Sequence, residues 1–195
     1  MNLVMTSPPA AYPVDLAQVR AQLGIDTEDY DARLAGLIAA ATEAVEIHIG
    51  RALITRGYSG YLNWFPSGPQ GHIRPYIQLE KPPLISVTAL TTFDDSDNAT
   101  VFPATSYYVD AVRTPGRIVL RRGQVWPIPL RMANGIKIDF SAGYGPNPGN
   151  VPESIRLAIL IMVGMFNEQR GDETSAPAMP PAVLALLSPF VFSPA

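Results

Sequence analysis

The chain contains two histidines, the residue type most often used as a metal ligand or as an acid and base near neutral pH. His48 shares a helical face with Ala41, Ala44 and Val45, which predicts a position at the edge of a core. His72 lies in a Gly/Pro-rich loop, without a carboxylate or second histidine at the spacing that zinc needs. Nucleophile-elbow, zinc-protease and phosphate-loop patterns are also absent from the sequence. We therefore predict no catalytic residue, no cofactor and no metal.

Residues 143–149 are rich in glycine and precede a predicted helix, a position at which phosphate groups often bind. Pro146 and Pro148, however, remove two of the backbone N–H groups that would hold a phosphate. The glycine spacing also differs from that of dinucleotide-binding loops. A structural turn between a strand and a helix is the better interpretation.

Residues 94–98, Asp-Asp-Ser-Asp-Asn, begin like a calcium-binding loop. The central glycine and the distal glutamate of such a loop are missing. The segment is therefore interpreted as a solvated hairpin turn, and weak cation binding stays open.

Composition restricts the class of protein further. With 47% hydrophobic and 16% charged residues, the 195-residue chain can fill a core, which argues against global disorder. Its net charge of −3 argues against non-specific nucleic-acid binding, which needs a basic surface. Positive charge in the region expected to form a sheet is either ordinary surface or a contact for an acidic partner or passing DNA. The residues concerned are Arg113, Arg117, Arg121, Arg122 and Arg131.

The compartment can also be predicted. The chain has no cysteine, so neither a disulfide framework nor a thiolate metal site can form. The apolar run at residues 157–166 is too short to span a bilayer, and no secretory signal is visible. These features indicate assembly in the cytoplasm without a membrane partner.

Apolar residues at helical spacing predict three helices, near residues 15–24, 27–49 and 151–170. The third is apolar on nearly all sides, so we expect little of it to face water.

Two of these helices begin with a possible capping box, in which paired side chains satisfy free backbone N–H groups. Asp15 and Gln18 have this spacing at the first helix, and Asn150 and Glu153 have it at the third.

The period changes between residues 52 and 149, where short strands alternate with turns. Residues 58–75 are interpreted as an irregular loop or an extended hairpin. Short strands joined by turns favour an antiparallel sheet. The predicted fold class is therefore α+β, a small helical bundle with an antiparallel β insertion. The expected strands are residues 77–79, 85–90, 107–110, 117–120 and 136–140.

Residues 172–195 form a polar, proline-containing linker followed by a short apolar helix that starts at Pro181 and by an aromatic end. An apolar peptide on a linker either docks on a partner or on a neighbouring copy, or folds back on its own core. The sequence leaves both readings open.

The ordered series of these segments resembles the head–tail connector (adaptor) proteins of tailed phages and phage-derived particles, in their longer form with a β insertion. The similarity covers residues 14 to 171. The segments that carry it are the opening helix pair at 15–23 and 34–51, then 79–90, 107–110, 115–120, Trp126-Pro127, 138–145 and 151–171.

The resemblance implies a structural adaptor with no enzymatic activity, located at the head–tail junction of a virion or gene-transfer particle. Such proteins form a homo-oligomeric ring of about twelve copies beneath the portal protein. The ring extends the DNA channel, without specific DNA binding, and attaches the stopper or tail protein. The C-terminal segment is implied to dock on the portal. The corresponding residues of this chain are Leu184, Leu187, Phe190 and Phe192.

The same resemblance implies a connector domain over residues 1–171, with its helical part at 14–51 and 150–171 and the β insertion at 52–149. Residues 172–195 would then be the C-terminal linker and docking segment.

Two alternatives stay open. The chain is another neck component, such as a stopper or tail-completion protein, or, less in keeping with its residues, a small-ligand enzyme that uses the sheet region and His72.

Overall fold

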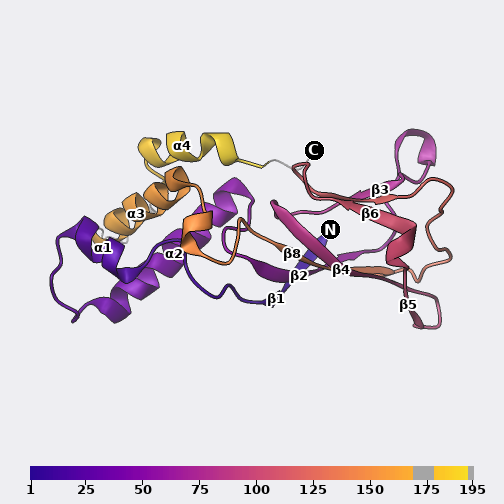
Figure 1. Cartoon of the computed structure of the whole chain (residues 1–195), viewed down its shortest axis with the longest axis horizontal. Helices are drawn as coiled ribbons and strands as arrows, with labels where there is room; N and C mark the ends of the chain where they lie inside the picture. The colour runs from indigo at the N-terminus through magenta and orange to yellow at the C-terminus, as the bar shows by residue number, and fades with distance from the viewer. Residues whose placement is uncertain (169–177, 193–195) are drawn as a thin grey trace. The chain divides into compact units, whose positions relative to one another are not determined.

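The computed structural model describes residues 1–168 and 178–192. The chain divides into two compact units (Figure 1). The β unit comprises Met1–Pro8 and Thr55–Tyr144, and the helical unit comprises Pro9–Ile54 and Gly145–Ala195. Each unit is therefore built from two separate stretches of the chain.

The larger sheet of the β unit has five antiparallel strands in the order β1-β2-β8-β4-β5. Side chains alternate between its faces, so that Ile136 and Ile138 of β8 are buried while Lys137 and Asp139 are partly exposed. This is the alternation that the sequence predicted. The strands are β1 (Asn2–Ser7), β2 (Arg56–Leu62), β4 (Leu84–Phe93), β5 (Ala99–Val101) and β8 (Ile136–Ala142).

The smaller sheet contains β3 (Tyr76–Gln78), β7 (Arg117–Leu120) and β6 (Tyr107–Asp110), in that order and antiparallel. In the view of Figure 1 it lies above the larger sheet. Ile77 and Ile118 of the smaller sheet are fully buried, as is Leu90 of the larger one. Burying a side chain of this size contributes about 1.5–3 kcal/mol, so both sheets add to the core of the β unit.

Three strands were not predicted. β2 overlaps the start of the segment interpreted as an irregular loop or extended hairpin, and it contains Gly57 and Gly60, which are unfavourable in strands. Gly57 lies close to β1, since an added Cβ would come within 2.8 Å of the Thr6 and Ser7 hydroxyl oxygens. β1 and the three-residue β5 are edge strands with few buried side chains, so they lack the alternation by which strands are recognised.

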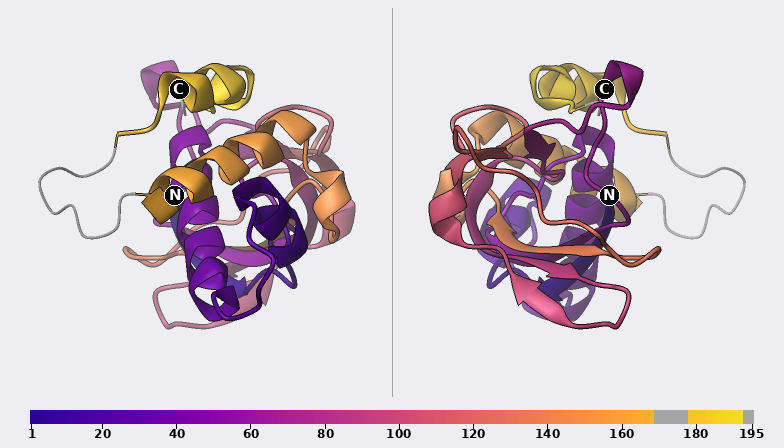
Figure 2. Two further views of the ribbon diagram at one scale, coloured as in Figure 1. Left: turned by 90° about the vertical axis from the view of Figure 1, so that its left-hand side faces the viewer. Right: turned by 90° about the vertical axis from the view of Figure 1, so that its right-hand side faces the viewer.

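The helical unit contains α1 (Leu16–Leu23), α2 (Asp31–Ile49), α3 (Glu153–Glu168) and α4 (Pro181–Leu187). Figure 2 shows α3 crossing α2, against which it packs. The core includes residues from all four helices. Its fully buried members include Val19, Leu34, Ile38, Val45, Ile49, Ile155, Ile159, Val163, Val183 and Leu187.

The helix boundaries confirm most of the prediction. Asp15 and Gln18 form the predicted capping box, with Gln18 N donating to Asp15 Oδ1 at 2.8 Å and Asp15 N donating to Gln18 Oε1. The capping box expected at α3 is wrong. Asn150 instead belongs to a short 3-10 turn, Pro148–Asn150, and its Oδ1 accepts from Asn147 N at 3.0 Å. α3 begins only at Glu153, because Pro152 disfavours the helical conformation for the preceding Val151, which is extended at φ −79 and ψ 133.

The burial of α3 also differs from the expectation. Ile155, Ile159 and Val163 on one side are buried, but Leu157 on the other side is exposed and Ile161 is half-buried. Among the described residues, the outer side of α3 is therefore half-buried, with Leu157 as its exposed large apolar side chain.

Candidate functional site

The C-terminal segment forms the predicted apolar helix, α4, and its four candidate docking residues differ in exposure. Leu187 is fully buried together with Val183, whereas Leu184 is 39% exposed. Phe190 and Phe192 are half-buried, in and just after a 3-10 turn, Ser188–Phe190. Thus α4 has an inner face that packs on the helical unit, chiefly on α3, and an outer face that is free in the described chain.

Polar contacts also attach the end of this segment to α2. Arg51 Nε donates to the carbonyl oxygen of Phe190 at 2.5 Å. The N–H of Phe192 donates to the carbonyl oxygen of Ile49 at 2.8 Å. Gly50, the left-handed C-cap of α2, lies so close that an added Cβ would be 2.9 Å from the carbonyl oxygen of Phe192. Of the two readings left open by the sequence, the structure therefore places residues 178–192 against the chain's own helical unit.

The turn that follows α2 depends on a buried acid that sequence reasoning did not identify. Glu46 is almost fully buried, and its Oε1 accepts a hydrogen bond from Leu53 N at 2.9 Å. A glutamate on the inner side of an otherwise apolar helix is the signal that could have found it, because buried acids need a partner. This bond fixes how the chain leaves α2.

The β unit presents a second surface that the sequence did not predict. Residues 123–134 between β7 and β8, here named the display loop, carry three strongly exposed apolar side chains. Val125 is 79% exposed, Ile128 is 69% exposed and Met132 is 75% exposed. Large apolar groups gathered on one loop are typical of an interaction surface.

Buried anchors hold the display loop from inside. The Trp126 ring stacks on Phe65 with centroids 4.7 Å apart and also contacts Phe102. Trp126 Nε1 donates to the carbonyl oxygen of Arg74 at 2.8 Å. Leu130 is buried as well. The exposed side chains are therefore carried on a loop whose intervening residues are part of the core.

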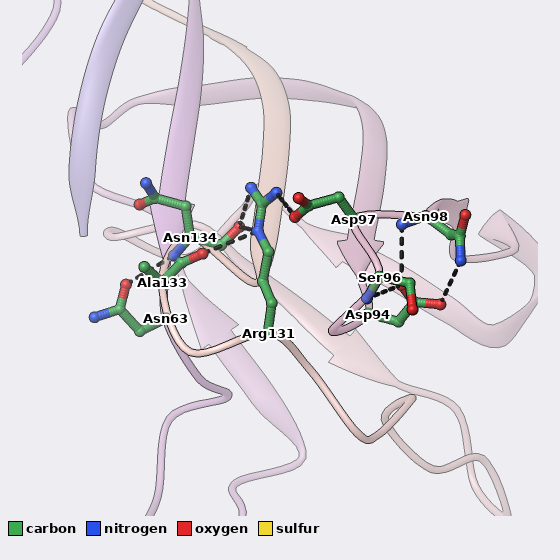
Figure 3. Close-up of polar contacts among 8 residues, drawn as sticks. All are labelled: Asn63, Asp94, Ser96, Asp97, Asn98, Arg131, Ala133 and Asn134. Carbon is green, nitrogen blue, oxygen red and sulfur yellow. Dashed lines mark hydrogen bonds and ion pairs between the residues drawn. The ribbon is translucent and has the colours of Figure 1, made fainter.

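Arg131 closes the end of the loop (Figure 3). Its guanidinium lies 4.1 Å from the Phe93 ring centroid and donates to the carbonyl oxygens of Ala133 and Asn134. It also makes an ion pair of 2.9 Å with Asp97. Asn134 N in turn donates to Asn63 Oδ1 at 3.0 Å. Arg131, a member of the predicted basic group, is therefore paired with neighbouring residues of its own chain.

The calcium-like segment is a hairpin turn, as predicted. Asp94 Oδ1 accepts from the backbone N–H groups of Ser96 and Asn98, and Oδ2 accepts from Asn98 Nδ2 (Figure 3). The side-chain bond from Asn98, followed by its backbone N–H, lowers the pKa of Asp94 below the usual value of 3.8. Both oxygens are therefore occupied within the turn.

The two histidines lie apart from any ligand set. His48 is on the exposed side of α2 rather than at the core edge, which corrects the sequence interpretation, and His72 is exposed in a loop. Across the described ranges 1–168 and 178–192, no three His, Cys, Asp or Glu residues are grouped closely enough to hold a metal. None of the helices in these ranges is long and apolar enough to cross a membrane.

The relationship to known proteins follows from a family comparison. The family model of head completion proteins matches residues 14–178. The chain belongs to this family. The sequence-based identification of a head–tail connector-type protein is confirmed, and so is the α+β fold class.

Solved structures extend this head completion protein's similarity to the whole chain. A chain in "Neck of empty GTA particle computed with C6 symmetry" is 26% identical with a TM-score of 0.80. A chain in "Neck of native GTA particle computed with C12 symmetry" is also 26% identical, with a TM-score of 0.78. Both alignments cover 100% of this chain and 97% of the other.

A third match, in "Virion of native gene transfer agent (GTA) particle", supports the fold at 23% identity and a TM-score of 0.77, again over 100% and 97% of the two chains. A search of curated proteins found no match.

Proposed function

We propose that this head completion protein is a structural adaptor in the neck of a tailed phage or gene-transfer particle. It joins the portal protein to the next neck or tail component and extends the channel through which DNA passes. The supporting observation is the similarity of its entire length to chains from two GTA particle necks, with TM-scores of 0.80 and 0.78. Its place is accordingly the head–tail junction.

In this proposal the functional form is a ring of about twelve copies. Neighbouring subunits of such a closed ring repeat one contact. The support is that the matched necks were computed with C6 and C12 symmetry. A ring of this kind needs two unlike surfaces on each subunit. Free apolar side chains occur on both units, including Met132 in the β unit and Leu157 in the helical unit.

Portal binding by the C-terminal segment is part of the same proposal. Leu184, with the exposed Val191, is available for direct contact while α4 stays on the helical unit. Leu187 is buried, so its function would be to position the outer face of α4. Phe190 and Phe192 are both half-buried, so each can contact the portal directly or help to position the outer face of α4.

DNA would pass the ring without specific binding. The net charge of −3 gives the chain no overall attraction for phosphates. A role as an enzyme receives no support from the exposed, separate histidines or from the occupied carboxylate of Asp94.

The test is deletion of the coding gene in the strain that makes the particle, followed by electron microscopy. We expect DNA-filled or empty heads without tails, and recovery of tailed particles when the full chain is supplied. Tailed particles at the normal frequency without the chain would contradict the proposal.

Reconstruction of the tailless heads separates an adaptor from a stopper or tail-completion protein. Loss of an adaptor leaves the portal as the last ring, whereas loss of a downstream protein leaves a further ring below the portal. Supplying a Leu184→Ala chain tests the docking segment, because truncation after Gly171 would also remove the buried Val183 and Leu187 from the core, whereas this exposed side chain can be lost without unfolding the helical unit.

A further inference from the structure

Charge is divided unequally between the two units of the chain. Of the 14 Lys and Arg residues, nine lie in the β unit and five in the helical unit; of the 17 Asp and Glu residues, six lie in the β unit and eleven in the helical unit. The β unit thus carries +3 and the helical unit −6, which together give the net −3 of the chain. Two copies would therefore attract each other most when the β unit of one meets the helical unit of the other.

The display loop is the part of the β unit best suited to such a contact. Its outward side chains, Val125, Ile128 and Met132, follow directly on Arg121 and Arg122, which are exposed. Arg122 makes no ion pair within the portion of the chain that the structure describes. Exposed apolar side chains on a loop next to an uncompensated cation are typical of a binding surface.

The loop is also held in one conformation before any partner binds. The N–H of Gln124 donates to the carbonyl oxygen of Arg121 at its start, and the N–H of Arg131 donates to that of Phe93 at its end. Trp126 and Leu130 fix the middle. Little conformational entropy would be lost on docking, which favours affinity.

The helical unit offers an uncovered surface on α2, in the unit of opposite net charge. Its exposed residues at helical spacing, here named the α2 outer face, are small or apolar except for one acid. A Cβ added at Gly36 would meet no atom within 4 Å, so the centre of this face is uncovered. The α2 outer face consists of Ala32, Ala35, Gly36, Ala40, Glu43 and Ile47.

Glu43 makes no ion pair among the described residues, and the loop before α2 adds the exposed acids Asp26 and Asp29. The small residues let a neighbouring backbone approach closely, and Ile47 offers an apolar contact at one end. The α2 outer face can therefore receive an apolar, cationic loop.

We propose that the display loop of one copy docks on the α2 outer face of the next copy. Val125, Ile128 and Met132 lie on the small residues, and Arg122 lies near the unpaired acids. Because the two surfaces differ, the contact is head-to-tail and repeats around a ring. This inference rests on the proposed function, since a ring of copies is what it builds.

The absence of cysteine from the chain permits a direct test. A V125C/A40C double variant is incorporated into particles, and a short bismaleimide reagent is added. We expect a ladder of dimers, trimers and longer oligomers of this chain. V125C or A40C alone should yield no ladder, because one cysteine of a head-to-tail contact faces no second cysteine.

A matched control replaces Val125 by Val112, which is 99% exposed in another loop of the same unit. The V112C/A40C variant should yield no ladder. If V125C/A40C chains are present in particles but give no ladder, or link only to a different protein, the inference is wrong and the proposed function stands. If the unaltered chain is absent from the particles, the proposed function fails and this inference with it.

A second variant, Gly36→Gln, tests the α2 outer face without new crosslinks. The free chain has room for this side chain, and replacing a helical glycine should preserve or raise stability. Docking would be obstructed, so the ladder from V125C/A40C should fall about tenfold or more. Ala21→Gln, on the exposed side of α1, should leave the ladder unchanged. An undiminished ladder with Gly36→Gln would overturn the proposed acceptor face.

Discussion

The backbone N–H of Phe192 donates a hydrogen bond to the carbonyl oxygen of Ile49, the last residue of α2, at 2.8 Å. The final carbonyl groups of a helix lack partners within the helix, so an outside donor stabilises the end. The C-terminal segment thus forms part of the C-terminal cap of α2. Its position and the stability of α2 are therefore coupled.

This coupling predicts that Gly50→Ala will be more harmful than an ordinary change of a helix-capping glycine. Gly50 has φ +67, and an added Cβ would lie 2.9 Å from the carbonyl oxygen of Phe192. We expect about 1–2 kcal/mol of backbone strain and a further loss of about 1–3 kcal/mol from the displaced segment. Chemical denaturation measures the total.

Gly24→Ala is the control for Gly50→Ala. Gly24 has nearly the same conformation, with φ +65, but no atom lies within 4 Å of the added Cβ. Gly24→Ala should therefore lower the free energy of unfolding only by the cost of the backbone strain. Equal losses in the two variants would mean that the segment near Phe192 contributes nothing at this cap.

Leu184 and Leu187, two of the leucines of α4, should separate stability from particle attachment. Leu187→Ala removes a fully buried side chain and should lower the free energy of unfolding by about 2–5 kcal/mol. Leu184→Ala changes an exposed position and should cost less than about 1 kcal/mol, yet lower the number of tailed particles. Normal particle yield with Leu184→Ala would remove this residue from the docking surface.

The stability of the display loop should depend on both the aromatic ring and the indole N–H of Trp126. Trp126→Phe keeps an aromatic ring beside Phe65 but leaves the carbonyl oxygen of Arg74 without its donor, a loss of about 1–3 kcal/mol. Trp126→Ala also removes the packing, and about 3–5 kcal/mol should be lost. Thermal unfolding ranks the three proteins. A Phe variant as unstable as the Ala variant would contradict a separate role for the hydrogen bond.

Asp94 should contribute to the pH dependence of stability. Hydrogen bonds from Asn98 lower its pKa in the folded chain, so the unfolded chain binds its proton more readily. Its contribution is present above about pH 4 and is lost as the pH falls through the lowered folded value. Asp94→Ala should reduce this acid sensitivity in denaturation curves between about pH 7 and pH 3.

Asp95→Ala provides the comparison, because Asp95 is exposed in the same turn without the bonds that Asp94 makes. An identical pH profile for the two variants would show that the Asp94 turn is not responsible.

The regular elements could be predicted because local residues determine them. The capping-box spacing of Asp15 and Gln18 predicted the start of α1. The alternation of apolar and polar residues predicted β6 at Tyr107–Asp110 and β7 at Arg117–Leu120. The display loop could not be found in this way. Val125, Ile128 and Met132 follow no helical or strand period, and which of them is exposed depends on Trp126 reaching the distant Phe65.

Prediction from local sequence has the same limit for the C-terminal segment. Apolar residues after Pro181 predicted the helix α4. Where this segment lies depends on the contacts of Phe190 and Phe192 with Arg51 and Ile49, more than a hundred residues earlier in the chain. No local pattern carries that information.

The most direct test of the neck assignment is electron microscopy of purified particles labelled with an antibody to this chain. The structural adaptor requires label at the head–tail junction, in particles that retain their tails. Particles without label there, when controls show that the antibody reaches its epitope, would contradict a place in the neck.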